Sequence, residues 1–271
     1  MHAGRVPAEP EPPDVPTWIA FDTETTGLEP GSQLVELAAI AFTDAGTVAS
    51  FDQLVRPTIA MPPDVVSIHG LRDEDLHGAN NASVVLQQFL DWLPDDAVLV
   101  AHNAGFDCDV LGWEADRAQL QLPDLRVIDT VPLARTLNAT ANCRLQTLCE
   151  HFSFQRLGDA HRALPDADSV RQLFLQLRRD LPEHEDWEPR VPRHGWQTVA
   201  DEELPAPLHG LADALRAGRA LEFTYRDARG HETRRAVTPW GYARVDAGIR
   251  FHGHCHLRQA RRHFAAERVS A

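Results

Sequence analysis

Four carboxylates and one histidine stand in three short segments of this chain. The segment FDTETTG carries Asp22 and Glu24, HNAGFD carries Asp107, and HRALPD carries His161 and Asp166. Carboxylate oxygens are the ligands that Mg²⁺ and Mn²⁺ prefer, and two such ions roughly 3.5–4 Å apart suit in-line attack on a phosphorus atom. We therefore expect the four carboxylates to hold two divalent cations, Mg²⁺ or Mn²⁺, at a site that cleaves phosphodiester bonds.

The spacing within these segments indicates what each residue would do. Asp22 and Glu24 are two positions apart at the end of an expected strand, so both side chains leave one face and repel each other unless a cation lies between them. Asp22 is the expected bridging ligand, with one ion activating the attacking water and the other stabilising the leaving 3′ oxygen. His161, on a turn before Asp166, is the expected general base. A lone histidine there would more often be a surface residue, but the other two segments favour the catalytic role.

The elements that must position these residues alternate between strands and helices. Periodicity and turn signals predict buried strands over residues 18–22, 33–43, 48–57, 97–103 and 125–130. Apolar stripes at helical spacing predict helices over residues 73–93, 108–120, 144–152 and 167–177. This order places the first carboxylate pair at a strand end and Asp166 at the start of the last helix.

The composition divides the chain into four parts. Residues 1–16 are rich in proline and glutamate and predict a disordered tail, and residues 17–180 carry the α/β pattern. Residues 181–206 combine prolines and charges without a period, which predicts a linker. Residues 207–271 predict a small β-rich domain with a short helix and a hairpin turning at Asp227–Gly230.

Charge and apolar content limit the possible functions. The net charge is −14, yet residues 1–200 carry 31 acidic side chains against 14 arginines, and residues 201–271 carry 9 against 12. Such an acidic protein can process DNA where divalent cations neutralise its site, but we do not expect it to hold long duplexes tightly. No apolar run approaches 18 residues and no apolar signal segment begins the chain, so we expect a soluble cytoplasmic protein with no membrane partner. The four cysteines form no paired motif, which favours free thiols.

The three segments resemble the motifs of the DEDDh 3′–5′ exonucleases, a family that includes the DnaQ-like epsilon subunit of bacterial DNA polymerase III. The resemblance runs from about Trp18 to Leu177 and includes RPTIAMPPDVVSIHGL, which is similar to a family segment ending in IHG. It implies a ribonuclease-H-like fold, with a mixed central sheet flanked by helices, and 3′-to-5′ release of nucleoside 5′-monophosphates. It also implies that the four carboxylates are the metal ligands and that His161 is the general base.

The same resemblance implies a pocket for the terminal nucleotide. Its expected lining residues are Thr25, Thr26, Leu28, His69, His102, Asn103 and Phe106. Phe106 could instead belong to the core and Asn103 could instead form a turn. Asp129 is expected to be structural.

The C-terminal region is similar to the WYL domain of bacterial regulators. The matching features are FTYR before a glycine turn, the segment TPWG, and LRQARRHFAAERV, although Arg250, Phe251 and His252 replace the signature tripeptide. The resemblance implies a small SH3- or Sm-like β-barrel that senses a ligand or nucleic acid. The arginines expected to do so are Arg226, Arg258, Arg261 and Arg262, although they could merely solvate the barrel.

Three histidines alternate in the same region, at His252, His254 and His256. Residues two apart on a strand share a face, so these side chains could bind Zn²⁺. A polar face lining a pocket is the favoured interpretation.

The sequence as a whole predicts a metal-dependent 3′–5′ exonuclease that hydrolyses single-stranded or frayed 3′ ends of DNA in repair or proofreading. Two alternatives remain open at this point: an RNA-trimming exoribonuclease, and a WYL-type regulatory or binding protein that uses a nuclease fold. The expected partner is nucleic acid, and a DNA polymerase or another repair protein is a further candidate.

Overall fold

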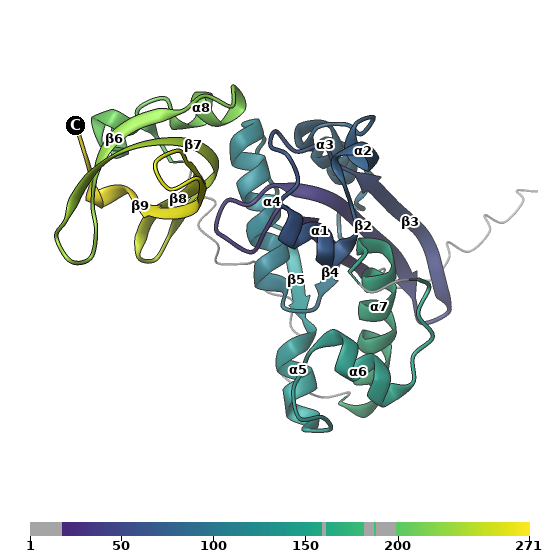
Figure 1. Cartoon of the computed structure of the whole chain (residues 1–271). Coiled ribbons are helices and arrows are strands. Elements are labelled where there is room, and N and C mark those ends of the chain that lie inside the picture. The colour runs from purple at the N-terminus through teal and green to yellow at the C-terminus, as the bar shows by residue number, and fades with distance from the viewer. Residues whose placement is uncertain (1–17, 159–160, 182–186, 188–198) are drawn as a thin grey trace, which may run out of the picture.

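The computed structural model of the 271-residue chain describes residues 18–158, 161–181, 187 and 199–271. Within these residues the chain forms two five-stranded sheets, which lie in separate parts of the molecule (Figure 1). The predicted tail at residues 1–16 and most of the predicted linker at residues 181–206 lie outside the described residues.

The first sheet is mixed and has the strand order β3-β2-β1-β4-β5. The central strand β1 pairs antiparallel with β2 and parallel with β4, and β4 pairs parallel with β5. The bounds are β1 (Trp18–Thr25), β2 (Leu34–Thr43), β3 (Gly46–Leu54), β4 (Val98–Ala101) and β5 (Arg126–Asp129). The predicted mixed central sheet is thus confirmed.

Helices cover both faces of this sheet. Their bounds are α1 (Pro63–His69), α2 (Asp73–Leu76), α3 (Ala82–Trp92), α4 (Ala104–Ala118), α5 (Thr130–Leu137), α6 (Leu145–Phe152) and α7 (Ala163–Asp180). Apolar side chains of α3 and α4 form the core on one face, and those of α5, α6 and α7 form the core on the other.

The predicted helices differ from the observed ones in several places, and α7 begins at Ala163 rather than at the predicted residue 167. The single helix predicted over residues 73–93 is broken, because the Asn81 side chain caps α3 by accepting a hydrogen bond from the Val84 amide at 3.1 Å. Helix α4 begins at Ala104, before the predicted start at Cys108. Helices α1 and α5 were not predicted at all, because both are short and follow proline-rich or strand-like sequence.

Alternation along β1 decides which helix each of its side chains meets. Ile19 and Phe21 enter the core on the α3 and α4 side, whereas Trp18 and Ala20 enter the core on the α7 side. Because successive strand residues point to opposite faces, Asp22 and Glu24 belong to the α7 side.

Three aromatic rings fix α7 against the sheet. Phe174 of α7 lies 5.5 Å from Trp18 of β1 and 5.7 Å from Phe42 of β2, measured between ring centroids. The Arg178 guanidinium lies 4.2 Å from the centroid of the Trp18 ring, where a cation is attracted to the ring face. These contacts hold the helix that carries Asp166 across β1 and β2.

The second sheet belongs to the C-terminal domain and is antiparallel, with the order β10-β6-β7-β8-β9. Its elements are α8 (Leu211–Arg216), β6 (Leu221–Arg226), β7 (Glu232–Val245), β8 (Gly248–Cys255), β9 (Ala260–Ala265) and β10 (Val269–Ser270), with short 3₁₀ turns at Asp201–Glu203, Ala206–Leu208 and Ala266–Arg268. The predicted hairpin turn at Asp227–Gly230 closes with a hydrogen bond from the Gly230 amide to the Asp227 carbonyl. The strand predicted at the C-terminus is interrupted by the last of these 3₁₀ turns.

None of the described helices combines the length and the apolar character that a membrane-spanning helix requires.

The aromatic contact of α7 yields a stability prediction. We expect Phe174→Ala to lower the free energy of unfolding by about 3–5 kcal/mol, because it removes a buried ring and leaves a cavity. Urea denaturation followed by far-UV circular dichroism measures this loss. Val48→Ala is the control, because Val48 lies 65% exposed on β3 and should change the stability by less than about 0.5 kcal/mol. An equal effect of the two substitutions would contradict the role given to the aromatic contact.

Candidate active site

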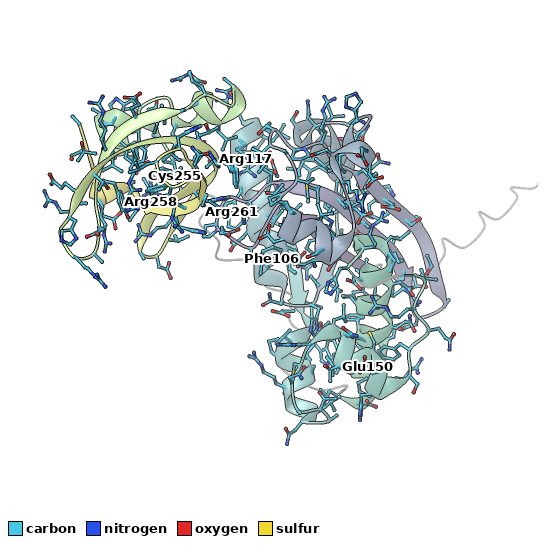
Figure 2. All side chains as sticks on the ribbon, viewed as in Figure 1. Phe106, Arg117, Glu150, Cys255, Arg258 and Arg261 are labelled. Atoms are coloured by element: carbon cyan, nitrogen blue, oxygen red, sulfur yellow. The ribbon has the colours of Figure 1, made fainter. Side chains whose placement is uncertain are left out.

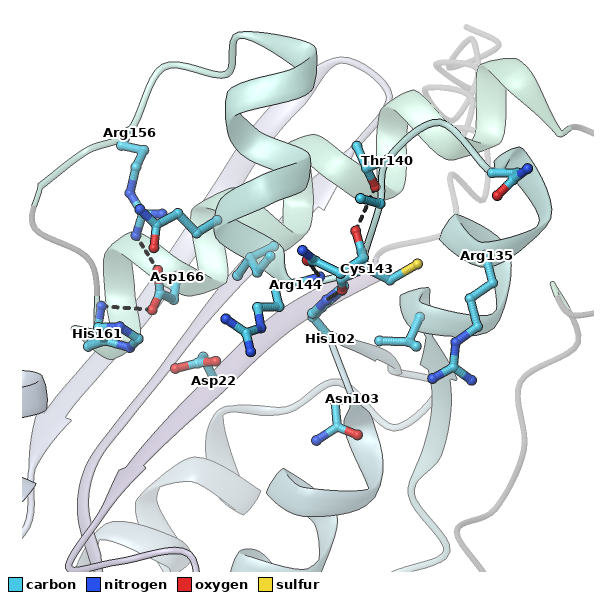
Figure 3. A pocket seen from close by; sticks show the side chains of 16 residues that line it. Asp22, His102, Asn103, Arg135, Thr140, Cys143, Arg144, Arg156, His161 and Asp166 are labelled. Atoms are coloured by element: carbon cyan, nitrogen blue, oxygen red, sulfur yellow. Dashed lines mark hydrogen bonds and ion pairs between the residues drawn. The ribbon is translucent and has the colours of Figure 1, made fainter.

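Three carboxylates from distant parts of the chain meet beside the end of β1. Single ligand oxygens of Asp22, Glu24 and Asp166 all lie within 4.8 Å of one another. Within the described residues, no other group of three or more His, Cys, Asp or Glu side chains lies close enough together to hold a metal ion. Asp22 and Glu24 come from β1, and Asp166 comes from the first turn of α7. Figure 3 shows Asp22, His161 and Asp166 at the same end of a cleft.

The fourth predicted ligand, Asp107, lies just outside this group. It belongs to the first turn of α4, and its Oδ1 accepts hydrogen bonds from the Thr23 amide at 3.0 Å and the Thr23 hydroxyl at 2.7 Å. Thr23 faces the opposite side of the strand from Asp22 and Glu24, because the alternation places it there. The structure therefore brings three predicted ligands together and ties the fourth to the neighbouring strand residue.

Burial and mutual repulsion raise the pKa values of these carboxyl groups. Burial raises the pKa of Asp22 well above its usual range, and repulsion from Asp107 and Glu24 adds to the effect. Burial, with repulsion from Asp166, raises the pKa of Glu24 to about 8, and burial raises that of Asp107 to about 7. A divalent cation would offset this repulsion and favour the ionised carboxylates, so the donor set fits Mg²⁺ or Mn²⁺.

Both oxygens of Asp166 have partners. The His161 amide donates a hydrogen bond to Oδ2 at 3.0 Å, and the Arg156 guanidinium forms an ion pair with Oδ1 (Figure 3). His161 itself adopts a left-handed backbone conformation with φ of 60°. The carboxylate expected to bind metal thus also fixes the backbone of the expected general base.

A buried glutamate anchors the HRALPD segment to the sheet. Glu36 of β2 is 1% exposed and lies opposite Glu24 in the strand register. Its carboxylate accepts hydrogen bonds from the Arg162 guanidinium, the shortest at 2.6 Å, and from the Ala163 amide at 2.9 Å. The sequence analysis missed this residue, although a single charge within the apolar run LVELAAIAF was a signal for it.

Arginines line the cleft together with the acidic group. The cleft has a volume of about 980 Å³, and Arg135, Arg144 and Arg156 contribute to its walls. Within the described part of the chain, the side chains of Arg135 and Arg144 form no hydrogen bond or ion pair, so their charges remain free for an anion. These arginines were not predicted, because α5 and the loops before and after α6 carry no motif.

The predicted nucleotide-pocket residues at the end of β1 fall into two kinds. The hydroxyl of Thr25 donates to the Gly27 carbonyl at 2.6 Å, and the hydroxyl of Thr26 accepts from the Gln33 amide at 2.9 Å. Both threonines are buried and shape the turn. Leu28, by contrast, is 80% exposed and is free to contact a ligand.

Hydrogen bonds hold the rings of the predicted pocket histidines His102 and His69, whereas Asn103 is exposed. His102 lines the cleft, and its Nε2 donates to the Cys143 carbonyl at 2.6 Å, while Nδ1 lies 2.8 Å from the Thr130 hydroxyl. His69 is buried, and its Nδ1 accepts from the Leu71 amide at 3.1 Å. Burial lowers the pKa of both rings. Asn103 is exposed and precedes α4 in a left-handed conformation.

Two neighbouring residues complete this picture. The Asp129 carboxylate accepts hydrogen bonds from the amides of Asn103 and Val131, which is the structural role expected of it. Phe106 is partly buried and packs against the core between the sheet and α4.

The arginines predicted to bind nucleic acid in the C-terminal domain differ in their surroundings. Arg226 pairs with Glu232 within its own hairpin, at 2.7 Å. Arg258 and Arg262 are exposed, whereas Arg261 pairs with Glu29 of the first domain at 3.0 Å.

The three alternating histidines do not form a metal-binding group within the described residues. His252 is buried and lines a small cavity, whereas His254 and His256 pack edge to face, with ring centroids 5.0 Å apart. The pocket-lining interpretation therefore applies to His252.

A mixed sheet with helices on both faces, and carboxylates gathered at the end of its central strand, is the arrangement expected of a metal-dependent nuclease. The family described as Exonuclease matches residues 19–174, and the WYL domain family matches residues 208–271. Because the first match covers more than half of the chain, this protein belongs to the exonuclease family and carries a WYL domain at its C-terminus.

The chain is similar in sequence to DNA polymerases of the PolC type. The chain is 34% identical to DNA polymerase III PolC-type of Oceanobacillus iheyensis over 171 residues, which are 62% of this chain and 12% of that protein. It is 33% identical to the corresponding protein of Listeria welshimeri over 172 residues, which are 63% of this chain and 12% of that protein. The chain thus spans about an eighth of the length of these relatives.

Solved structures share the fold. Exonuclease X in complex with 5′-overhanging duplex DNA gives a TM-score of 0.52 at 23% identity, covering 65% of this chain and 99% of that one. A 3′-exonuclease that recognises the histone mRNA stem-loop gives a TM-score of 0.58 at 16% identity, covering 69% of this chain and 92% of that one. Exonuclease I gives a TM-score of 0.56 at 15% identity, covering 88% of this chain and 55% of that one. The matched 88% of this chain is longer than its first domain.

The raised pKa values predict a pH-dependent stability. A carboxyl whose pKa is higher in the folded than in the unfolded protein favours folding while it is protonated, and this contribution is lost as the pH rises through the folded value. We therefore expect the melting temperature of the metal-free protein to fall between about pH 4 and 8, because the carboxyls of Asp107 and Glu24 ionise near pH 4 in the unfolded chain but only near pH 7 and 8 in the folded protein. Scanning calorimetry in a chelator measures this decline.

Saturating Mg²⁺ or Mn²⁺ should remove the decline and raise the melting temperature at pH 9 by several degrees, since a ligand at 100 times its Kd adds about 2.7 kcal/mol. Glu24→Gln should reduce the decline in the chelator, whereas Glu74→Gln, on the exposed helix α2, should leave it unchanged. A pH profile that metal does not alter would refute the predicted cation site.

Proposed function

We propose that this chain is a metal-dependent 3′–5′ exonuclease that hydrolyses DNA ends to nucleoside 5′-monophosphates. The observation that carries the proposal is the group formed by Asp22, Glu24 and Asp166 within 4.8 Å, with His161 lining the same cleft. Membership of the exonuclease family, and the similarity to PolC-type polymerases, support this reaction.

Each residue of the site has a proposed role in hydrolysis. Asp22, Glu24 and Asp166 would hold divalent cations, with Asp107 completing the set for a second ion. When bound, such ions neutralise phosphate charge and lower the pKa of the attacking water. His161 is the proposed general base for the attacking water, and the hydrogen bond that its backbone amide donates to the Asp166 carboxylate holds it in place.

The cleft supplies the remaining contacts with the substrate. Arg135 and Arg144 are unpaired among the described residues, and we assign them to the phosphates that follow the scissile bond into the cleft. Leu28, which is exposed on the loop that follows Glu24 in the chain, is assigned to the terminal base. These few phosphate contacts suit a single strand or a frayed end, and the acidic surface of the first domain disfavours a long duplex.

The choice between DNA and RNA rests on the relatives. The PolC-type proteins carry a DNA polymerase name, whereas one structural neighbour recognises the stem-loop of a histone mRNA. We propose DNA as the substrate, because the relatives at 33–34% identity are DNA polymerases and the mRNA enzyme is 16% identical. An RNA-trimming activity is the second candidate, and parallel reactions on matched DNA and RNA strands distinguish them.

The biological setting that we propose is repair or proofreading. The PolC-type relatives make a polymerase a reasonable partner, but the WYL domain here favours a nuclease that works apart from a polymerase chain. A purely regulatory role is disfavoured, because all five predicted catalytic residues are present in the sequence.

The proposed reaction is tested with single-stranded DNA labelled at either end. We expect Mg²⁺- or Mn²⁺-dependent release of mononucleotides, with label lost first from the 3′ end. His161→Ala should lower kcat by about 10²–10⁴-fold, as for removal of a general base, and Asp22→Asn should abolish turnover. His77→Ala is the control, because His77 is exposed and lies outside the site. Loss of label first from the 5′ end, or full activity of Asp22→Asn, would exclude the proposal.

The role of the cleft arginines is tested separately. We expect Arg144→Ala to raise KM for a single-stranded oligonucleotide and to reduce the slope of log(kcat/KM) against log[salt] by about 0.7, because one phosphate contact is lost. Arg126→Ala is the matched control, since Arg126 is exposed on the edge strand β5. An unchanged salt slope for Arg144→Ala would remove this arginine from the phosphate path.

A further inference from the structure

The loop between β1 and β2, residues 26–33, leaves the sheet directly after the metal-binding carboxylates. The first domain holds its far end. The Arg117 guanidinium of α4 donates hydrogen bonds to the Gly31 carbonyl at 3.0 Å and the Ser32 carbonyl at 3.1 Å. These bonds fix where the loop returns to β2, but they do not reach the part that carries Leu28.

The C-terminal domain holds the near end of the same loop. Arg261 of β9 donates hydrogen bonds to Oε1 of Glu29 at 3.0 Å and to the Thr26 carbonyl at 3.4 Å. The guanidinium therefore bridges the two sides of Leu28, one through a side chain and one through the backbone. Figure 2 shows Arg117 and Arg261 at the junction where the C-terminal domain meets α4.

The backbones of the two domains touch beside this bridge. A Cβ atom built on Gly31, whose φ is 82°, would lie 2.4 Å from the Tyr242 nitrogen. One built on Gly241 would lie 2.1 Å from the Gly31 carbonyl oxygen. The Gln33 side chain also donates to the Trp240 carbonyl at 2.9 Å. The domains therefore meet in one closely packed arrangement, which gives Arg261 a defined position relative to the loop.

The surroundings strengthen the ion pair of Arg261. Its side chain is 18% exposed and that of Glu29 is 21% exposed, so water screens the pair less than it screens a surface pair. The neighbouring His252 does not compete as a cation, because burial lowers its pKa to about 4. His263 approaches Glu29 at 3.6 Å but is 60% exposed. Arg261 is thus the principal cation that faces Glu29.

We propose that Arg261 is a positioning residue for the exonuclease reaction, which fixes the Leu28 segment of the active-site loop from the C-terminal domain. This inference rests on the proposed function, because Leu28 matters only if a terminal nucleotide binds there. Under this proposal the WYL domain contributes to catalysis without binding a ligand itself. It also differs from the sequence-based expectation that Arg261 binds nucleic acid directly, because its guanidinium is already committed to the loop.

Steady-state kinetics on a single-stranded oligonucleotide tests this role. We expect Arg261→Ala to lower kcat/KM roughly 10-fold, with kcat falling as well as KM rising, because a misplaced loop misaligns the terminal nucleotide. Arg261→Lys should recover part of the loss, since an ammonium can pair with Glu29 but lacks the planar fork that also reaches the Thr26 carbonyl. Arg234→Ala is the control, because Arg234 is 80% exposed and pairs with Glu222 on the outer surface.

A double substitution separates positioning from direct contact. If Arg261 acts through the loop, Leu28→Ala should remove most of its influence, so the double variant should be only slightly slower than the slower single variant. A different result would show that Arg261 contacts a phosphate: the two substitutions lower kcat/KM by factors that multiply in the double variant, and Arg261→Ala reduces the salt dependence of kcat/KM while leaving kcat unchanged. A change in kcat/KM below about twofold for Arg261→Ala would overturn the proposal.

Hydrogen exchange keeps this test independent of turnover. We expect the amides of residues 26–33 to exchange faster in Arg261→Ala than in the wild type, while those of β1 stay protected. If the wild-type chain releases no nucleotides, the proposed function fails, and the loop contact is still decided by this exchange. Unchanged exchange in the loop would overturn the positioning role even in an active enzyme.

Discussion

Repulsion among the carboxylates at the end of β1 is the constraint on which the rest of the first domain depends. Asp22, Glu24 and Asp166 meet within 4.8 Å, and burial raises the pKa values of the two residues that β1 contributes. Such a group is unfavourable for folding unless protons or cations compensate it. The surrounding structure must therefore hold these side chains in place against a force that would separate them.

Polar contacts keep these side chains in place, because they bind each segment of the candidate site to a neighbouring element. Glu36 binds the start of α7 through Arg162, and the amide of His161 binds the carboxylate of Asp166. Asp107 is restrained on the other face of the strand by Thr23. Behind these contacts, the aromatic packing of α7 on β1 and β2 supplies apolar burial that offsets the unfavourable charge group. The site and the core are in this way parts of one arrangement.

The C-terminal domain restrains the loop after β1, which is proposed to contact the substrate. The loop after β1 cannot be anchored by the carboxylates, and within the first domain Arg117 holds its far end. Arg261 and the close approach of Gly31 to Tyr242 add a second anchor from a separate domain. A nuclease domain fused to a small β-domain can thus gain order in its active-site loop without adding residues to the site itself.

Local sequence determined the parts of this protein that depend on short spacings. The two-residue period of a strand put Asp22 and Glu24 on one face, and the apolar stripe of α7 placed Asp166 at a helix start, so the fold class and the grouping of these three carboxylates could be predicted. Only the tertiary structure decided that Thr23 holds Asp107, that Glu36 anchors the last motif and that Arg261 faces Glu29. These three contacts join residues far apart in the chain, and their partners are chosen by packing geometry, which no local pattern encodes.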